Sequence, residues 1–185
     1  MGVHRLNGTL RPVIFLDRDG VINEVKLINS KPYPPSNADE VVLIDGIRET
    51  VTKLLELGFR LIIVTNQPDV ARGRQIKSEV EAINNVIRMS IPIDEIRVCY
   101  HDIEDNCECR KPKPGLLLHD SGNIDFTRSY MIGDRSKDIE AGLRANCRTI
   151  FIDYNYSEPK PSFSHHTISS VQHILPTIIG DLIND

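Results

Sequence analysis

Three acidic residues have the spacing and surroundings needed for chemistry on a phosphate group. Asp17 and Asp19 lie two residues apart and are followed by Gly20, so their side chains point the same way if the backbone is extended. Two neighbouring carboxylates repel each other unless a cation or a proton joins them. Together with Asp134 they would form an oxygen site that suits Mg²⁺, which prefers few carboxylates, several waters and a phosphate. A simple turn is the alternative interpretation of this first motif taken alone.

Other polar residues could complete a phosphate site. Thr65 can donate its hydroxyl to a phosphate oxygen, Lys111 can neutralise phosphate charge, and Arg110 can hold an anion with two hydrogen bonds. A solvated basic turn is the alternative for Arg110 and Lys111. Asp138 is either an acid in the first turn of a helix, where the helix dipole favours it, or a further group at the metal. The spacing leaves that choice open.

A second candidate metal site lies between residues 99 and 109. Three thiols and one imidazole, from Cys99, His101, Cys107 and Cys109, make a complete tetrahedral set for Zn²⁺ with no open position, which predicts a structural site. Reduced unpaired thiols and a redox-sensing disulfide are the alternatives. Because Cys109 directly precedes Arg110, a metal that folds this loop would also fix the cations that follow it.

These side chains must be positioned by the elements that precede them. Short apolar runs, typical of strands buried on both faces, alternate with helical patterns, which predicts βαβ units and a parallel sheet with helices on both faces. Asp17, Thr65 and Asp134 each follow a strand directly, so we expect them at one edge of the sheet, where open α/β sheets bind ligands. The predicted strands cover residues 13–16, 61–64, 96–100, 130–132 and 149–152.

The remaining segments are read as helices and loops. Helical periodicity runs over 47–55, 76–87, 139–143 and 171–182, with a short helix at 116–119. Pro176 predicts a kink or a late start in the last helix. The segment 21–39 is predicted to be a loop or a small flap. The segment 154–166 is predicted to be a loop, with a solvated turn at His165 and His166. We predict one domain over residues 1–185 with no large cap.

Composition excludes several classes of function. The chain has 185 residues, 40% of them hydrophobic, and a formal net charge of −4, so no basic surplus favours a nucleic-acid partner. No apolar run approaches the roughly 18 residues needed to span a membrane. The first residues lack the apolar core of a signal peptide, which predicts a cytoplasmic protein. The oligomeric state is left open by the sequence, and a monomer is compatible with it.

In their order along the chain, the motifs resemble the haloacid dehalogenase (HAD) superfamily of phosphohydrolases. These motifs are Asp-X-Asp-Gly at 17–20, a strand ending in Thr65, then Lys111, then Gly-Asp-X-X-X-Asp at 133–138. The resemblance implies a Rossmann-like core in which Asp17 is the nucleophile and Asp19 the general acid and base. It also implies that the backbone carbonyl of Asp19, more than its side chain, reaches the metal.

The thiol motif is similar to a narrower group, the D-glycero-D-manno-heptose 1,7-bisphosphate phosphatases, and to the related histidinol-phosphate phosphatases. Cys-X-Cys-Arg-Lys-Pro at 107–112 and Asp-Arg-Asp-Gly at 17–20 carry this likeness. The chain departs from the heptose group at Pro68 and Asp69, in the 24–39 loop and at Arg135, which are positions expected to line the mouth of the substrate site. The implied substrate-binding residues are Thr65, Asn66, Gln67, Arg110, Lys111 and Arg135. The implied Mg²⁺ ligands are Asp17, Asp19 and Asp134. The implied zinc ligands are Cys99, His101, Cys107 and Cys109.

The resemblance implies Mg²⁺-dependent hydrolysis of a phosphate monoester through an aspartyl-phosphate on Asp17. The expected substrate is a small phosphorylated sugar, D-glycero-D-manno-heptose 1,7-bisphosphate, which would lose one phosphate to give the heptose 1-phosphate. Histidinol phosphate is the alternative substrate. A non-catalytic zinc-binding interaction module is the alternative from a different class of protein.

Overall fold

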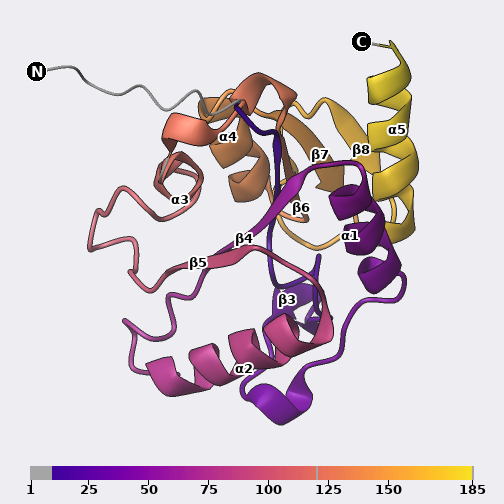
Figure 1. Ribbon diagram of the computed structural model, residues 1–185. Helices are drawn as coiled ribbons and strands as arrows, with labels where there is room; N and C mark the ends of the chain where they lie inside the picture. The colour runs from indigo at the N-terminus through magenta and orange to yellow at the C-terminus, as the bar shows by residue number, and fades with distance from the viewer. Residues whose placement is uncertain (1–9, 120, 185) are drawn as a thin grey trace, which may run out of the picture.

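The computed structural model describes residues 10–119 and 121–184, and its centre is a six-stranded parallel sheet (Figure 1). The strand order is β5-β4-β1-β6-β7-β8, so the first strand lies in the middle and the chain first builds one side of the sheet, then the other. The strands are β1 (Val13–Leu16), β4 (Arg60–Asn66), β5 (Glu95–Cys99), β6 (Tyr130–Gly133), β7 (Arg148–Ile152) and β8 (His166–Ile168).

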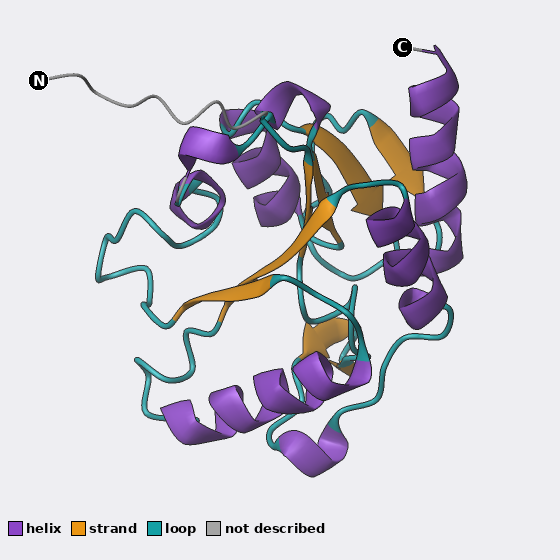
Figure 2. Ribbon diagram, viewed as in Figure 1, coloured by secondary structure: helices purple, strands orange, loops and turns teal. Residues whose placement is uncertain are grey.

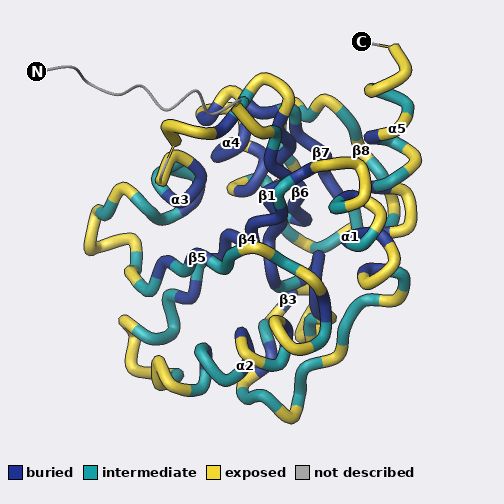
Figure 3. The backbone as a smooth tube through the Cα atoms, in the orientation of Figure 1, coloured by how far each residue is buried: buried dark blue, intermediate teal, exposed yellow. Residues whose placement is uncertain are grey.

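Helices cover both faces of this sheet, as the sequence predicts. In β1, Ile14 and Leu16 belong to one apolar cluster, whereas Val13 and Phe15 belong to the other, because successive side chains of a strand alternate between faces. The first face packs against α1 (Ile47–Glu56), α2 (Lys77–Ser90) and α5 (Ile174–Asn184); the second packs against α3 (Gly115–Leu118) and α4 (Ser136–Arg144). Figure 3 shows the central strands as buried.

The segment predicted to be a loop or flap contains a two-stranded hairpin, β2 (Lys26–Ile28) and β3 (Lys31–Tyr33) (Figure 2). Its alternating pattern is too short and too rich in proline to stand out from the sequence. The hairpin contacts the segment after β7, since the Ser157 amide donates to the Ser30 carbonyl at 3.0 Å. In the described part of the chain no larger insertion interrupts the sheet.

The prediction of a loop through residue 166 was wrong at its end. There β8 adds a sixth strand beside β7, and its three residues give too short a pattern to recognise. The expectation of a solvated turn was also wrong for His166, which lies in β8, whereas His165 is exposed at the bend before it. The Thr149 amide donates to Nδ1 of His165 at 3.1 Å, and Nε2 of His166 lies 3.0 Å from Oδ2 of Asp181 in α5.

The C-terminal helix starts late, as Pro176 predicts. A 3₁₀ turn (Val171–His173) precedes α5, and Pro176 lies in the first helical turn, where a missing amide hydrogen costs nothing. Among residues 10–119 and 121–184 there is no helix with the length and apolar character needed to cross a membrane.

Candidate active site

Two of the three carboxylates predicted to form the oxygen site, those of Asp17 and Asp134, meet at the sheet edge, and Asp138 joins them there in place of the Asp19 side chain. Asp17 follows β1, Asp134 follows β6, and Asp138 lies in the first turn of α4; oxygens of all three lie within 4.8 Å of one another. Local backbone geometry makes this approach possible. Gly20 has a φ of +90°, and a Cβ there would lie 2.0 Å from Oδ2 of Asp134. Glycine is therefore required after the Asp-X-Asp pair.

Lys111 is the cation of this cluster. Its buried Nζ donates to Oδ1 of Asp17 and to the Val64 carbonyl, both at 2.8 Å, and lies 2.6 Å from Oδ1 of Asp138. Burial alone would lower the pKa of Lys111, but the charges of Asp138 and Asp17 raise it above its usual value. The backbone of Lys111 is tied to β4 by two reciprocal hydrogen bonds with the Asn66 side chain, of 3.0 and 3.1 Å.

One lysine does not neutralise three carboxylates. Burial, followed by the charge of Asp138, raises the pKa of Asp17 to about 6 against the opposing effect of Lys111. Burial and the charge of Asp17 raise the pKa of Asp134 well above its usual value. Both oxygens of Asp134 are buried without a hydrogen-bond partner among the described residues. These hard oxygen donors with excess negative charge fit a divalent cation such as Mg²⁺.

The side chain of Asp19 lies outside this cluster. Arg18, which is fully buried, holds its carboxylate with two hydrogen bonds of 3.1 and 3.0 Å. Gln67 donates to Asp19 at 2.8 Å and also to the hydroxyl of Thr65 at 2.8 Å. Burial would raise the pKa of Asp19, but the Arg18 charge and these hydrogen bonds hold it below its usual value. The Asp19 carboxyl is therefore ionised in this arrangement.

Asp138 has the two roles that the sequence left open. It stabilises the start of α4, because its Oδ2 accepts the backbone N–H of Arg135 at 3.1 Å. Its other oxygen forms the ion pair with Lys111 and belongs to the carboxylate cluster. The signal that could have resolved this is Gly133, where a Cβ would lie 2.2 Å from Cβ of Asp138, since such a glycine indicates close packing against the following helix.

A cavity of about 320 Å³ opens from this cluster to the surface. Asp17, Thr65 and Lys111 lie at its buried end, and more exposed cationic side chains lie towards its mouth. Sequence reasoning did not assign the contribution of the β2–β3 hairpin to its wall, including Lys31 and Tyr33. The positively charged lining residues are Lys31, Arg72, Arg74, Arg110, Lys111, Arg135 and Lys137.

Arg135 and Arg110 line this cavity while also holding its walls. Arg135 donates to the Pro32 carbonyl in the hairpin at 3.0 Å and pairs with Glu158 at 3.2 Å. Arg110 donates to the carbonyl of His101 at 3.0 Å. Arg135 therefore connects two segments of the cavity wall, and Arg110 connects the wall to the start of the loop after β5.

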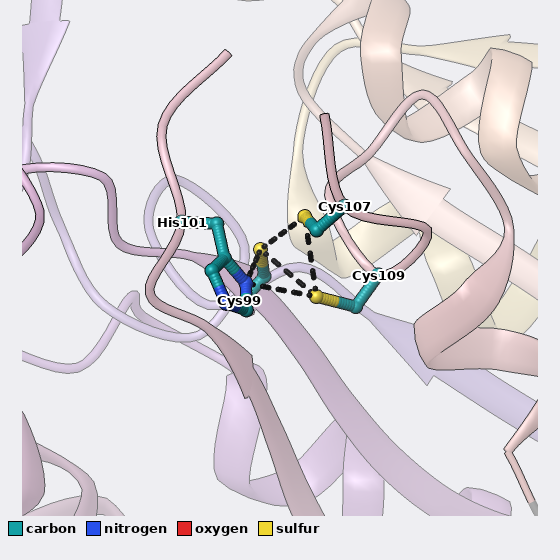
Figure 4. A group of neighbouring side chains, drawn as sticks. All are labelled: Cys99, His101, Cys107 and Cys109. Carbon is teal, nitrogen blue, oxygen red and sulfur yellow. Dashed lines mark hydrogen bonds between the residues drawn. The ribbon is translucent and has the colours of Figure 1, made fainter. Parts of the chain in front are cut away.

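The four predicted zinc ligands converge at the end of β5 and in the loop that follows it (Figure 4). Sγ of Cys109 lies 3.3 Å from Sγ of Cys99 and 3.4 Å from Sγ of Cys107, and Nδ1 of His101 lies 3.3 Å from Sγ of Cys109. A tetrahedral zinc site with bonds near 2.3 Å has ligand–ligand edges of about 3.8 Å. The donor set and spacing therefore fit Zn²⁺. Cys147 lies apart from this cluster, buried in the core.

Comparison with known proteins agrees with this architecture. A family model described as HAD-hydrolase-like matches residues 108–174. A solved D,D-heptose 1,7-bisphosphate phosphatase from B. bronchiseptica, complexed with magnesium and phosphate, superimposes with a TM-score of 0.74 over 92% of this chain and 99% of that one, at 22% identity. The fold and the carboxylate site together define a HAD-like hydrolase.

Two curated relatives narrow this class. Both are D-glycero-β-D-manno-heptose-1,7-bisphosphate 7-phosphatases. The Yersinia pestis protein is 36% identical over 152 residues, covering 75% of this chain and 78% of the relative. The Escherichia coli K12 protein is also 36% identical over 152 residues, covering 75% of this chain and 76% of the relative. The chain belongs to the family of these heptose bisphosphate phosphatases.

Proposed function

We propose that this phosphatase hydrolyses the 7-phosphate of D-glycero-β-D-manno-heptose 1,7-bisphosphate and leaves the phosphate at position 1 in place. The observation that carries the proposal is the pairing of buried Asp17 with Lys111 at the end of a cavity whose mouth is rich in cations. The reacting phosphate would occupy the buried end. The names and identity of the curated relatives support this choice of substrate.

Asp17 is the proposed nucleophile. Its Oδ1 is held by Lys111 at 2.8 Å and also accepts the Arg18 amide at 2.8 Å, which fixes the direction of the carboxylate. Attack on phosphorus forms an aspartyl-phosphate and releases the sugar oxygen. Lys111 and the hydroxyl of Thr65 would then stabilise charge on the transferring group. Fixing these groups on strand ends lowers the barrier by orienting them in advance.

Asp19 is the proposed general acid and base. It would protonate the departing sugar oxygen and later accept a proton from the water that cleaves the aspartyl-phosphate. Its lowered pKa suits the second role. The first role requires its carboxyl to take up a proton, and therefore to loosen the pair with Arg18. Gln67, which contacts both Asp19 and Thr65, would keep Asp19 oriented towards the phosphate.

Two metals fit the proposal. Asp17 and Asp134, with Asp138 beside them, would hold Mg²⁺ together with the Asp19 carbonyl. When bound, Mg²⁺ would neutralise charge on the phosphoryl oxygens. Zn²⁺ would be held by Cys99, His101, Cys107 and Cys109, where it would stabilise the loop that carries Arg110 and Lys111.

Phosphate release from a panel of substrates tests the proposal. The panel contains both anomers of the heptose bisphosphate, histidinol phosphate and fructose 1,6-bisphosphate. We expect the heptose bisphosphate to exceed histidinol phosphate by at least about tenfold in kcat/KM, because cations at the mouth attract a second phosphate and repel an amine. A higher kcat/KM for histidinol phosphate would reject the heptose bisphosphate as the substrate, and the proposed phosphatase chemistry would still stand.

A further inference from the structure

The loop that carries the cysteines also contains an aspartate whose only strong side-chain partner in the described chain is an arginine of the cavity. The carboxylate of Asp102 accepts hydrogen bonds from Nε and Nη2 of Arg72, both at 2.6 Å. This is a two-point contact between the loop after β4 and the loop after β5. Arg72 lines the cavity, whereas Asp102 does not. Asp102 therefore contacts Arg72 from outside the cavity and would not touch a bound substrate.

Asp102 is itself held in place. Its Oδ1 also accepts the amide of Ile103 at 2.8 Å, and its own amide donates to Asp105 at 2.7 Å. Arg72 is about one-third exposed, so without this contact its long side chain would sample many rotamers. On its other side the Arg72 guanidinium makes only a longer contact, from Nη1 to Oδ1 of Asp69 at 3.4 Å. An anion in the cavity could take these N–H groups in place of Asp69.

A second guanidinium adjoins the same carboxylate. Nη2 of Arg110 lies 3.9 Å from Oδ1 of Asp102, and its Nη1 is held by the carbonyl of His101, the residue before Asp102. Arg72 and Arg110 thus flank one aspartate, and Asp69, which also lines the cavity, is a second carboxylate in contact with Arg72. Both arginines lie on the cavity wall, away from the buried Asp17 and Lys111 pair.

We propose that Asp102 is a positioning residue that orients Arg72, beside Arg110, to bind the second phosphate of a doubly phosphorylated sugar while the first phosphate lies at Asp17. The inference rests on the proposed function, because it assigns the group that the substrate retains. The Asp102–Arg72 pair would act on substrate affinity and on the choice between doubly and singly charged substrates. It would not act on the chemical step.

Kinetics of Asp102→Ala with two substrates test this role. For the heptose bisphosphate we expect KM to rise about tenfold with kcat within about twofold, because binding energy that is the same in ground and transition states is lost. For p-nitrophenyl phosphate, which has no second phosphate, we expect both constants to stay within about twofold. Asp102→Glu, which keeps the carboxylate, should recover part of the affinity.

A double-mutant cycle identifies the partner. If Asp102 acts through Arg72, then Asp102→Ala should change KM by less than about twofold in an Arg72→Ala background. Glu104→Ala is the matched control, because it removes an exposed carboxylate of the same loop that does not line the cavity. This variant should match the wild type on both substrates.

The possible outcomes distinguish a failure of the positioning role from a failure of the proposed function. An unchanged or lower KM in Asp102→Ala would overturn the positioning role, and a lower one would mean that Asp102 competes with the substrate for Arg72. Equal losses on both substrates would also overturn it, since they indicate a damaged fold. A wild-type chain that cleaves p-nitrophenyl phosphate but not the heptose bisphosphate would reject the proposed function itself, and the second-phosphate assignment with it.

Discussion

The two candidate metal sites of this chain are held in opposite ways. The carboxylates lie at strand ends and in the first turn of a helix, so the sheet fixes them even though they repel one another. The cysteines lie mostly in a loop of 15 residues, numbers 100–114, that contains no helix or strand. The first site is shaped by the fold and carries an electrostatic cost. The second site lies in a loop without regular structure, which a bound Zn²⁺ would stabilise. Loss of metal should therefore affect chemistry at one site and structure at the other.

The largest effect should come from Asp17→Asn. An amide cannot form the aspartyl-phosphate, so we expect kcat to fall by at least about 10³-fold, which corresponds to about 4 kcal/mol in the barrier. The fold should persist, because the sheet fixes this position independently of its charge. Phosphate release and circular dichroism measure the two effects. Retention of more than a few per cent of the wild-type rate would reject Asp17 as the nucleophile.

The same variant gives a pH test of the electrostatic cost. The pKa of Asp17 is about 6 in the folded metal-free chain, against 3.8 as its ordinary value. The folded state then binds more protons than the unfolded state between these values, so this group makes the metal-free chain less stable as pH rises from about 4 to 6. Asp17→Asn should therefore melt above the wild type at pH 7, and the difference should shrink at pH 4.

Removing the Mg²⁺ site should be the next largest effect. Asp134→Asn should lower kcat about 100-fold, and its metal-free form should melt above the metal-free wild type, because one of three repelling carboxylates is neutralised. Calorimetry with and without Mg²⁺ measures this. Mg²⁺ should raise the melting temperature of the wild type more than that of the variant. Equal Mg²⁺ effects on both chains would remove Asp134 from the ligand set.

Cys107→Ser tests the candidate zinc site. We expect zinc content to fall below one ion per chain, the melting temperature to drop, and activity to fall about tenfold as the loop that leads to Lys111 loosens. Elemental analysis, melting curves and phosphate release provide the three readings, and Cys147→Ser is a control thiol outside the cluster. Wild-type protein that is purified under reducing conditions without any zinc would contradict the structural role.

The smallest effect concerns selectivity. Arg110→Ala should narrow the preference for heptose bisphosphate over histidinol phosphate by roughly fivefold, mainly through a higher KM for the bisphosphate. Lys113→Ala is the matched control, because Lys113 is a cation of the same segment whose contacts are with Asn106 and Glu108 at the surface. An equal loss of kcat/KM on both substrates would indicate that Arg110 only stabilises the loop and does not contact the substrate.

The sequence predicts most of the fold and the chemistry, for an identifiable reason. Continuous apolar runs mark β1 and β4 clearly, and the polar residues that follow them must meet because parallel strands end at one edge. What it misses depends on partners distant in sequence. The contact of Gln67 with Asp19, the link of Arg135 to the hairpin and the pairing of Asp102 with Arg72 produce no periodic pattern in the sequence. Strand β8, of three residues, is below the length at which a pattern can be recognised.

The ion pair between Lys111 and Asp17 also affects how the chain can be made. The two residues are 94 positions apart, so a ribosome adding 5–20 residues per second delivers the lysine about 5 to 20 s after the aspartate. During that interval β1 would have to place an unpaired carboxylate in the interior. We therefore expect the nascent sheet to close around the active site only after the second half of the chain, with Lys111, has been synthesised.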